Sequence, residues 1–123
     1  MQLQNNMFSI ISSSVKGDDF EYNICLNENC NIYRAHFPES PITPGVCVLQ
    51  IAKELFEERM KCLVEIIKIK NVKFLQVMIP TPNAEYTYHF SNITLDGNTY
   101  KMKVVVVNGD ITYSKLSFTC QKS

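Results

Sequence analysis

The sequence predicts a single α+β domain, residues 1–123, in which a curved antiparallel sheet wraps around one long central helix. Three observations support this prediction. A segment from Val46 to about Lys61 has the periodicity of an amphipathic helix, and segments rich in β-branched and aromatic residues lie on both sides of it. The pairs Asp96-Gly97 and Asn108-Gly109 are typical of hairpin turns. A single sheet can bury the apolar face of one helix only by curving around it.

The predicted strands fall before and after the helix. Before it, residues 7–15 and 20–26 form an expected hairpin around the turn at residues 16–19. Residues 27–31 are rich in turn formers, and residues 32–35 lead into the next loop. After the helix, Pro80 and Pro82 separate the second expected strand from the third. The strands expected there are residues 64–69, 71–78, 84–93, 99–107 and 110–120.

The predicted helix has one apolar and one polar face. Its apolar residues are Val48, Leu49, Ala52, Leu55, Phe56, Met60 and Leu63, and the polar ones are Lys53, Glu54, Glu57, Glu58 and Lys61. By helical angle alone, Gln50 lies on the polar side and would be an ordinary solvent-facing residue. In the sheet, the alternation of Tyr86, Tyr88 and Phe90 predicts core or interface positions, while His89 points to the surface.

Composition excludes several classes of function. Twelve basic and twelve acidic residues give a net charge of zero, so the sequence predicts no nucleic-acid partner. The five cysteines are an odd number without zinc-site spacing, and we expect free thiols, no metal and no cofactor. No apolar run approaches the ~20 residues of a membrane span, and the polar start does not resemble a signal peptide. We therefore expect a cytoplasmic protein.

The segment from His36 to Gln50 is the candidate site. It holds one of two histidines and three of five prolines, which predict a stiff, extended loop able to fix His36 in place. Pro44 is tolerated in a first helical turn, and Gly45 permits close approach to its backbone. Free N–H groups at this helix start would favour a ligand that develops negative charge.

This segment resembles the 3-hydroxyacyl-acyl carrier protein dehydratases of fatty acid synthesis. Their signature, His-Phe-Pro-x-x-Pro-x-x-Pro-Gly-Val, is matched at seven fixed positions in eleven, and the similarity extends more weakly over most of the chain. The matching residues are His36, Phe37, Pro38, Pro41, Pro44, Gly45 and Val46. The family carries an acidic residue four positions after the Val, where this chain has Gln50.

The resemblance implies a hot-dog fold and a site shared between two subunits. In such a dimer, the histidine of one subunit faces the acidic position of the other at the mouth of an acyl tunnel. His36 would be the base that removes the C2 proton, and the N–H of Gly45, helped by that of Phe37, would polarise the thioester carbonyl. Val46 would line the substrate site, and an acyl carrier protein would deliver the acyl group.

Gln50 leaves the acid of the reaction open. An amide can bind the substrate hydroxyl but cannot donate a proton to leaving hydroxide. His36 could return the C2 proton, Cys47 or Glu54 on the same helical face could supply one, or a related subunit could bring a carboxylate. The sequence thus predicts dehydration to the trans-2-enoyl thioester in fatty acid or polyene-type biosynthesis, with activity reduced by Gln50. The alternative is a weak or inactive subunit that binds acyl chains or pairs with an active dehydratase.

Two further interpretations concern partners and a related chemistry. Positive charge after the helix would form either a solvated face or a docking patch for an acidic carrier protein. It comes from Arg59, Lys61, Lys68, Lys70 and Lys73. Long apolar strands favour edge-to-edge dimerisation, as a homodimer or a heterodimer. A thioesterase of the same fold is less favoured, because those enzymes use a carboxylate where this chain has an amide.

Overall fold

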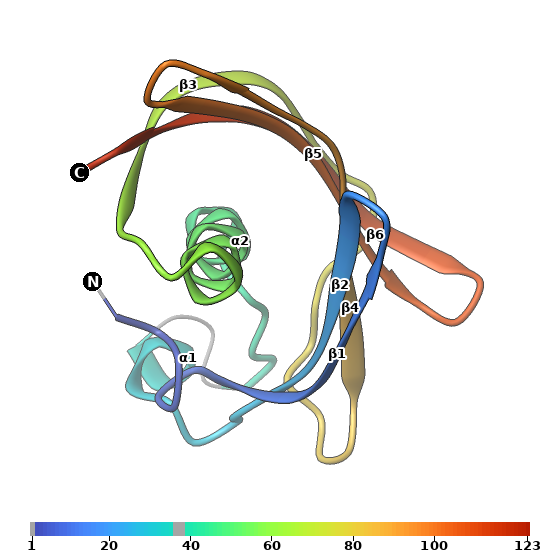
Figure 1. Cartoon of the computed structure of the whole chain (residues 1–123). Coiled ribbons are helices and arrows are strands. Elements are labelled where there is room, and N and C mark those ends of the chain that lie inside the picture. The colour runs from blue at the N-terminus through green and yellow to red at the C-terminus, as the bar shows by residue number, and fades with distance from the viewer. Residues whose placement is uncertain (1, 36–38) are drawn as a thin grey trace.

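The computed structural model describes residues 2–35 and 39–123. It confirms the α+β architecture: one antiparallel sheet of six strands curves around a central helix. The helices are α1 (Asn31–Ala35) and α2 (Gly45–Met60). The strands are β1 (Phe8–Lys16), β2 (Asp19–Leu26), β3 (Val64–Phe74), β4 (Glu85–Asp96), β5 (Thr99–Asn108) and β6 (Ile111–Lys122). Figure 1 shows the sheet as an open arc with α2 on its concave side.

The strand order is β1-β2-β4-β5-β6-β3, so β1 and β3 are the two edges of the sheet. Each neighbouring pair is antiparallel. The predicted hairpins are confirmed at Gly17, Gly97 and Gly109, all of which have positive φ. Glycine adopts this conformation without a steric penalty, which is why the turn signals in the sequence were informative.

One local prediction was wrong. The expected strands 64–69 and 71–78 are one strand, β3, that ends at Phe74, and the chain from residue 75 to 84 has no strand. Register shifts between Ile66 and Lys68 and between Ile69 and Asn71 change the inside-outside alternation. Because of these bulges, the sequence of one continuous strand has the pattern expected of two. Residues 32–35, expected only to lead into the next loop, lie in the short helix α1.

The core lies between α2 and the concave face of the sheet. Ile51, Ala52, Leu55 and Phe56 of the helix are fully buried against the sheet. Phe20 stacks on Phe90 with ring centroids 4.5 Å apart. The predicted core position of the β4 aromatic residues is confirmed, since Tyr86, Tyr88 and Phe90 are at most 3% exposed. This packing fixes the position of α2, and with it the start of the helix.

Candidate functional site

The loop before α2 is held in place by buried hydrogen bonds. The N–H of Thr43 donates to the carbonyl of Met78 at 2.8 Å, and the Thr43 hydroxyl donates to the same carbonyl at 2.9 Å. The hydroxyl of Tyr33 lies 2.7 Å from Thr43 Oγ1 and, because the Thr43 proton is committed to Met78, Tyr33 donates. The stiff loop expected from the prolines is therefore also pinned by α1 and by the segment after β3. His36 and Phe37 lie outside the described residues.

Helix α2 begins with open backbone donors. Its N-cap is Pro44, which has extended backbone angles and makes no side-chain capping bond. The N–H groups of Cys47 and Val48 both donate to the Pro44 carbonyl, at 2.9 and 3.1 Å. The N–H groups of Gly45 and Val46 precede them, and donors in the first turn of a helix have no acceptor within the helix. The helix dipole adds partial positive charge at the same place.

A cavity of about 290 Å³ opens beside this helix start. Its wall combines the loop before α2, the first turns of α2, the end of β3 with the segment after it, and β6. The residues most relevant here are Thr43, Gly45, Val48, Phe74, Met78 and Ser114. The ring of Phe74 lies so close that a Cβ on Gly45 would be 2.8 Å from its Cε2 and Cζ atoms. A side chain at position 45 would therefore force the Phe74 ring to move.

The predicted substrate residues Gly45 and Val46 are placed differently. Gly45 lines the cavity, whereas the Val46 side chain is 67% exposed and is not part of the cavity wall. Single exposed apolar residues such as this valine are common on protein surfaces. Within one chain, only Gly45 of this pair contacts the cavity.

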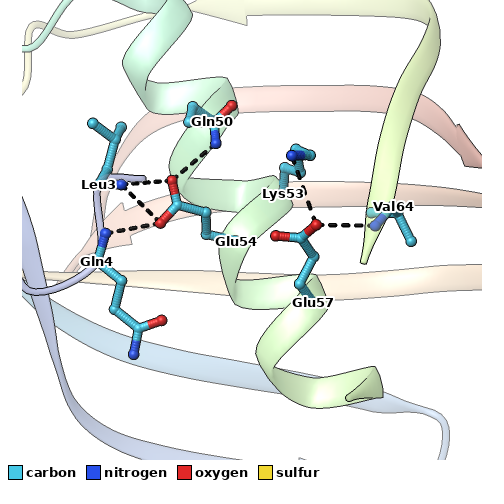
Figure 2. A network of polar contacts seen from close by, with 7 residues as sticks. All are labelled: Leu3, Gln4, Gln50, Lys53, Glu54, Glu57 and Val64. Atoms are coloured by element: carbon cyan, nitrogen blue, oxygen red, sulfur yellow. Dashed lines mark hydrogen bonds and ion pairs between the residues drawn. The ribbon is translucent and has the colours of Figure 1, made fainter. Parts of the chain in front are cut away.

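Gln50 belongs to a polar network that joins α2 to the N-terminal segment (Figure 2). Its side-chain amide donates to Glu54 Oε2 at 2.9 Å. The Glu54 carboxylate also accepts the N–H of Leu3 at 2.8 Å and 3.0 Å and the N–H of Gln4 at 2.8 Å. Because an ionised carboxylate can only accept, the NH₂ group of Gln50 must face it. Gln50 is half-buried, so it is not the ordinary solvent-facing residue that periodicity alone indicates.

The two helix residues considered as alternative acids occupy different environments. Glu54 is only 4% exposed, and its oxygens are engaged by backbone and side-chain N–H groups. Cys47 is 3% exposed, and burial raises the pKa of its thiol. Neither residue is part of the wall of the cavity beside Gly45. Sequence analysis did not predict that Glu54 is buried and binds the N-terminal segment, because its partners there are about 50 residues away in the chain.

The remaining candidates are arranged as follows. His89 is on the outer face of β4, as predicted, and lies 3.8 Å from Glu21 with a 47% exposed side chain. The predicted basic patch is divided: Lys61 pairs with Glu58 at 3.6 Å, and Arg59 lies over the ring of Phe20. Lys68 and Lys70 instead line a concavity of about 290 Å³ together with Lys101 and Lys103.

Among residues 2–35 and 39–123, no group of three or more His, Cys, Asp or Glu side chains is placed to hold a metal ion. Within the same described ranges, no helix has the length and apolar character needed to cross a membrane. All five cysteines are unpaired thiols, as predicted.

Solved structures of known proteins share this architecture. The structure of the dehydratase heterocomplex ApeI:P from Xenorhabdus doucetiae matches with a TM-score of 0.66 at 18% identity, over 91% of this chain and 96% of that one. A thioesterase from Haemophilus influenzae matches with a TM-score of 0.62 at 12% identity, over 97% and 80% of the two chains. An uncharacterized protein from Erwinia carotovora subsp. atroseptica matches with a TM-score of 0.66 at 16% identity, over 92% and 94%. At these identities the likeness shows the fold, which is the hot-dog fold.

The family is shown by sequence. Residues 12–116 match the model of the ApeI-like family, described as ApeI dehydratase. A comparison with curated protein sequences gives no significant match. The match to the family model covers most of the chain, and the protein therefore belongs to the ApeI-like dehydratase family. The expectation of a dehydratase-type hot-dog protein is confirmed at this level.

Proposed function

We propose that this protein dehydrates a 3-hydroxyacyl thioester, carried on an acyl carrier protein, to the trans-2-enoyl thioester. The observation that carries this proposal is the cavity beside the start of α2, where Gly45, the first residue of the helix, forms part of a largely apolar wall. A developing enolate oxygen needs fixed donors, such as those of a helix start, in a site of low polarity. Family membership supports the reaction type. A role in fatty acid or polyene-type biosynthesis is part of the same proposal.

His36 is the proposed base. It removes the C2 proton, the C2–C3 double bond forms, and the C3 hydroxyl leaves with a proton as water. Histidine suits this step because its intrinsic pKa is near neutral. Gln50 is proposed to bind the substrate hydroxyl from the helix of the facing subunit. The proton that leaves with the hydroxide then comes from His36 itself or from a second subunit. Glu54 and Cys47 are less suited to supply it, because both are buried and neither lines the cavity.

A direct assay tests the proposal. The protein is incubated with 3-hydroxyacyl carrier protein, and formation of the 2-enoyl product is followed by mass spectrometry as loss of one water. Loss of a positioned general base costs ~10²- to 10⁴-fold in rate, so His36→Ala should be nearly inactive. His89→Ala is the matched control, since it removes the other histidine from an exposed position on β4. Unchanged turnover in His36→Ala, or no turnover by the wild type alone or with a related partner chain, contradicts the proposal.

A second function is favoured by one specific observation. Gln50 has no ionisable group, and its amide is directed to Glu54. A subunit without its own acid would suit pairing with an active dehydratase, and one structure that this chain resembles is the dehydratase heterocomplex ApeI:P from Xenorhabdus doucetiae. Turnover that appears only when a related hot-dog chain is added would support the role of a partner or acyl-binding subunit. Turnover by the purified chain alone would support the first function.

The proposed carrier protein would dock on basic surface. Lys68, Lys70, Lys101 and Lys103 surround one concavity, and none of the ion pairs among the described residues involves them. Unpaired lysines on one surface attract an acidic partner and accelerate its association. Replacing Lys101 and Lys103 by Glu should therefore raise KM for the carrier-bound substrate while leaving KM for a pantetheine-bound substrate unchanged. An equal effect on both substrates would argue against docking here.

A further inference from the structure

Ser114 is a buried polar residue whose side chain has no partner among the residues that the structure describes. It lies on β6, is 1% exposed, and its Oγ atom makes no hydrogen bond there. A serine hydroxyl offers one donor and two acceptor sites. Burying such a group unpaired is unfavourable, and isolated cases in native proteins call for an explanation.

The strand register places Ser114 at the candidate site. Its direct neighbours are Phe74 on β3 and Val106 on β5. Directly opposed residues of antiparallel strands point to the same face of the sheet, and Val106 is fully buried on the concave side. Phe74 in turn touches Gly45 at the start of α2. Phe74 is therefore a neighbour of both Ser114 and Gly45, and all three residues line the same cavity.

The chemistry of the cavity wall indicates what the hydroxyl would bind. The wall is largely apolar, and the described residues that line it include no Lys, Arg or His. Of its two hydroxyl groups, that of Thr43 already donates to Met78 and accepts from Tyr33. The Ser114 hydroxyl is therefore the wall's hydroxyl without a partner in the described part of the chain, and Gly45 at the start of α2 lines the same wall. Neutral donors without a cation suit a neutral carbonyl oxygen better than a carboxylate or a phosphate.

We propose that Ser114 is a substrate-binding residue whose hydroxyl donates a hydrogen bond to the thioester carbonyl oxygen in this cavity. The proposal rests on the proposed function and adds a second donor to the one at Gly45. It explains why a polar side chain remains at a position where both cross-strand neighbours are apolar. An acyl thioester would then occupy the space under Phe74, with its carbonyl oxygen between β6 and the start of α2.

Binding of an unreactive probe tests this role separately from turnover. The probe is a short saturated acyl chain joined to pantetheine by an amide, which keeps the carbonyl oxygen but has no 3-hydroxyl group to eliminate. Its affinity is measured by titration calorimetry. Loss of one neutral hydrogen bond weakens binding by about 3- to 10-fold, which is the effect expected for Ser114→Ala. Ser114→Thr retains the hydroxyl and should bind more tightly than Ser114→Ala.

Ser117→Ala is the matched control. Ser117 lies on the same strand but three residues along, is half-buried, and lines the lysine-rich concavity instead. It should leave probe affinity unchanged. Thermal unfolding shows whether each variant folds, and Ser114→Ala should be at least as stable as the wild type because it removes an unpaired hydroxyl.

Each outcome has a defined meaning. Equal affinity of Ser114→Ala and the wild type overturns the proposal, as does equal weakening by Ser117→Ala or no binding of the probe to the wild type. Selective weakening in Ser114→Ala supports it. If the probe binds through Ser114 but the wild type never forms the enoyl product, the proposed reaction fails while the binding role stands. If Ser114→Ala keeps both its turnover and its affinity for the probe, the proposed reaction stands while the binding role of Ser114 fails.

Discussion

The side-chain amide of Gln50 donates a hydrogen bond to the Glu54 carboxylate at 2.9 Å, one turn along helix α2. Glu54 in turn holds the backbone of the N-terminal segment through Leu3 and Gln4. Gln50 is thus linked to a buried carboxylate that has a structural task. Any change at Gln50 alters that carboxylate's surroundings as well as the candidate site.

Glu54→Ala should destabilise the protein by about 1–3 kcal/mol, because it leaves the buried N–H of Leu3 and the N–H of Gln4 without acceptors. Chemical unfolding measures the loss, and hydrogen exchange should show faster exchange at both amides. Glu58→Ala is the control: that side chain is 41% exposed in an ion pair with Lys61, so the change should stay within about 0.5 kcal/mol. Equal stability of the two variants would show that Glu54 does not anchor the N-terminal segment.

Gln50→Glu should raise dehydratase activity while lowering stability at neutral pH. It supplies the acid that the proposed reaction lacks at this position but places two carboxylates in contact, which cannot both ionise without cost. The contact raises the pKa of one of the two carboxyl groups, at positions 50 and 54, so that this group keeps its proton to a higher pH in the folded state than in the unfolded state. Its stability relative to the wild type is therefore best at acid pH and declines as pH rises to neutral. Unfolding at about pH 4.5 and about pH 7 checks the sign.

The double variant Gln50→Glu with Glu54→Gln separates the two effects. It exchanges the amide and the carboxylate, so one hydrogen-bonded pair of the same kind remains. Much of the lost stability should return at neutral pH, and the gain in activity should persist. A Gln50→Glu variant with wild-type activity and wild-type stability would place residue 50 outside both the site and the network.

Stability should fall at alkaline pH because of Cys120. Burial raises the pKa of its thiol from 9.0 to about 12, with smaller effects from Lys53, which lowers it, and Glu57, which raises it. A raised pKa means that the folded state favours the neutral thiol. Its contribution is present below about pH 9 and is lost as pH rises toward 12. Unfolding curves at about pH 8 and about pH 10 should show a smaller decline in Cys120→Ala than in the wild type.

Cys62→Ala serves as the comparison for that experiment, since Cys62 is only half-buried. Alkylation under native conditions gives a second readout. Cys120 has no exposed surface and should remain unmodified until the protein unfolds. An identical decline with pH in Cys120→Ala and the wild type would exclude the buried thiol as its source.

The free edge of β3 should form a contact between subunits. This strand ends the sheet, and Ile67 and Ile69 on it are each 51% exposed. An uncovered apolar edge strand favours pairing with another chain. Light scattering at micromolar concentration should give a dimer for the wild type and a monomer for Ile67→Lys with Ile69→Lys. Ile111→Lys, at a 52% exposed position on β6, should remain dimeric. A monomeric wild type would contradict the prediction.

Local sequence patterns were sufficient for most of the architecture. The helix from Gly45 to Met60 and the hairpins at Gly17, Gly97 and Gly109 could be predicted because periodicity and glycine conformation act over a few residues. The same applies to the proline-rich loop and to a helix start with open N–H groups. The family signature then connected this loop with a reaction type, and the match over residues 12–116 confirms the family.

Tertiary structure decided what depends on distant partners. β3 is one strand with bulges, because its pairing with β6 continues past Lys70 and Asn71, where the apolar pattern of the sequence is interrupted. Glu54 became an anchor only through amides about 50 residues away, and that contact fixes the surroundings of Gln50. Ser114 reads as an ordinary strand residue, yet sheet register buries it beside Phe74 and the start of α2. Local periodicity specifies which face a residue takes, but only the pairing of the strands in the folded sheet specifies which neighbours share that face.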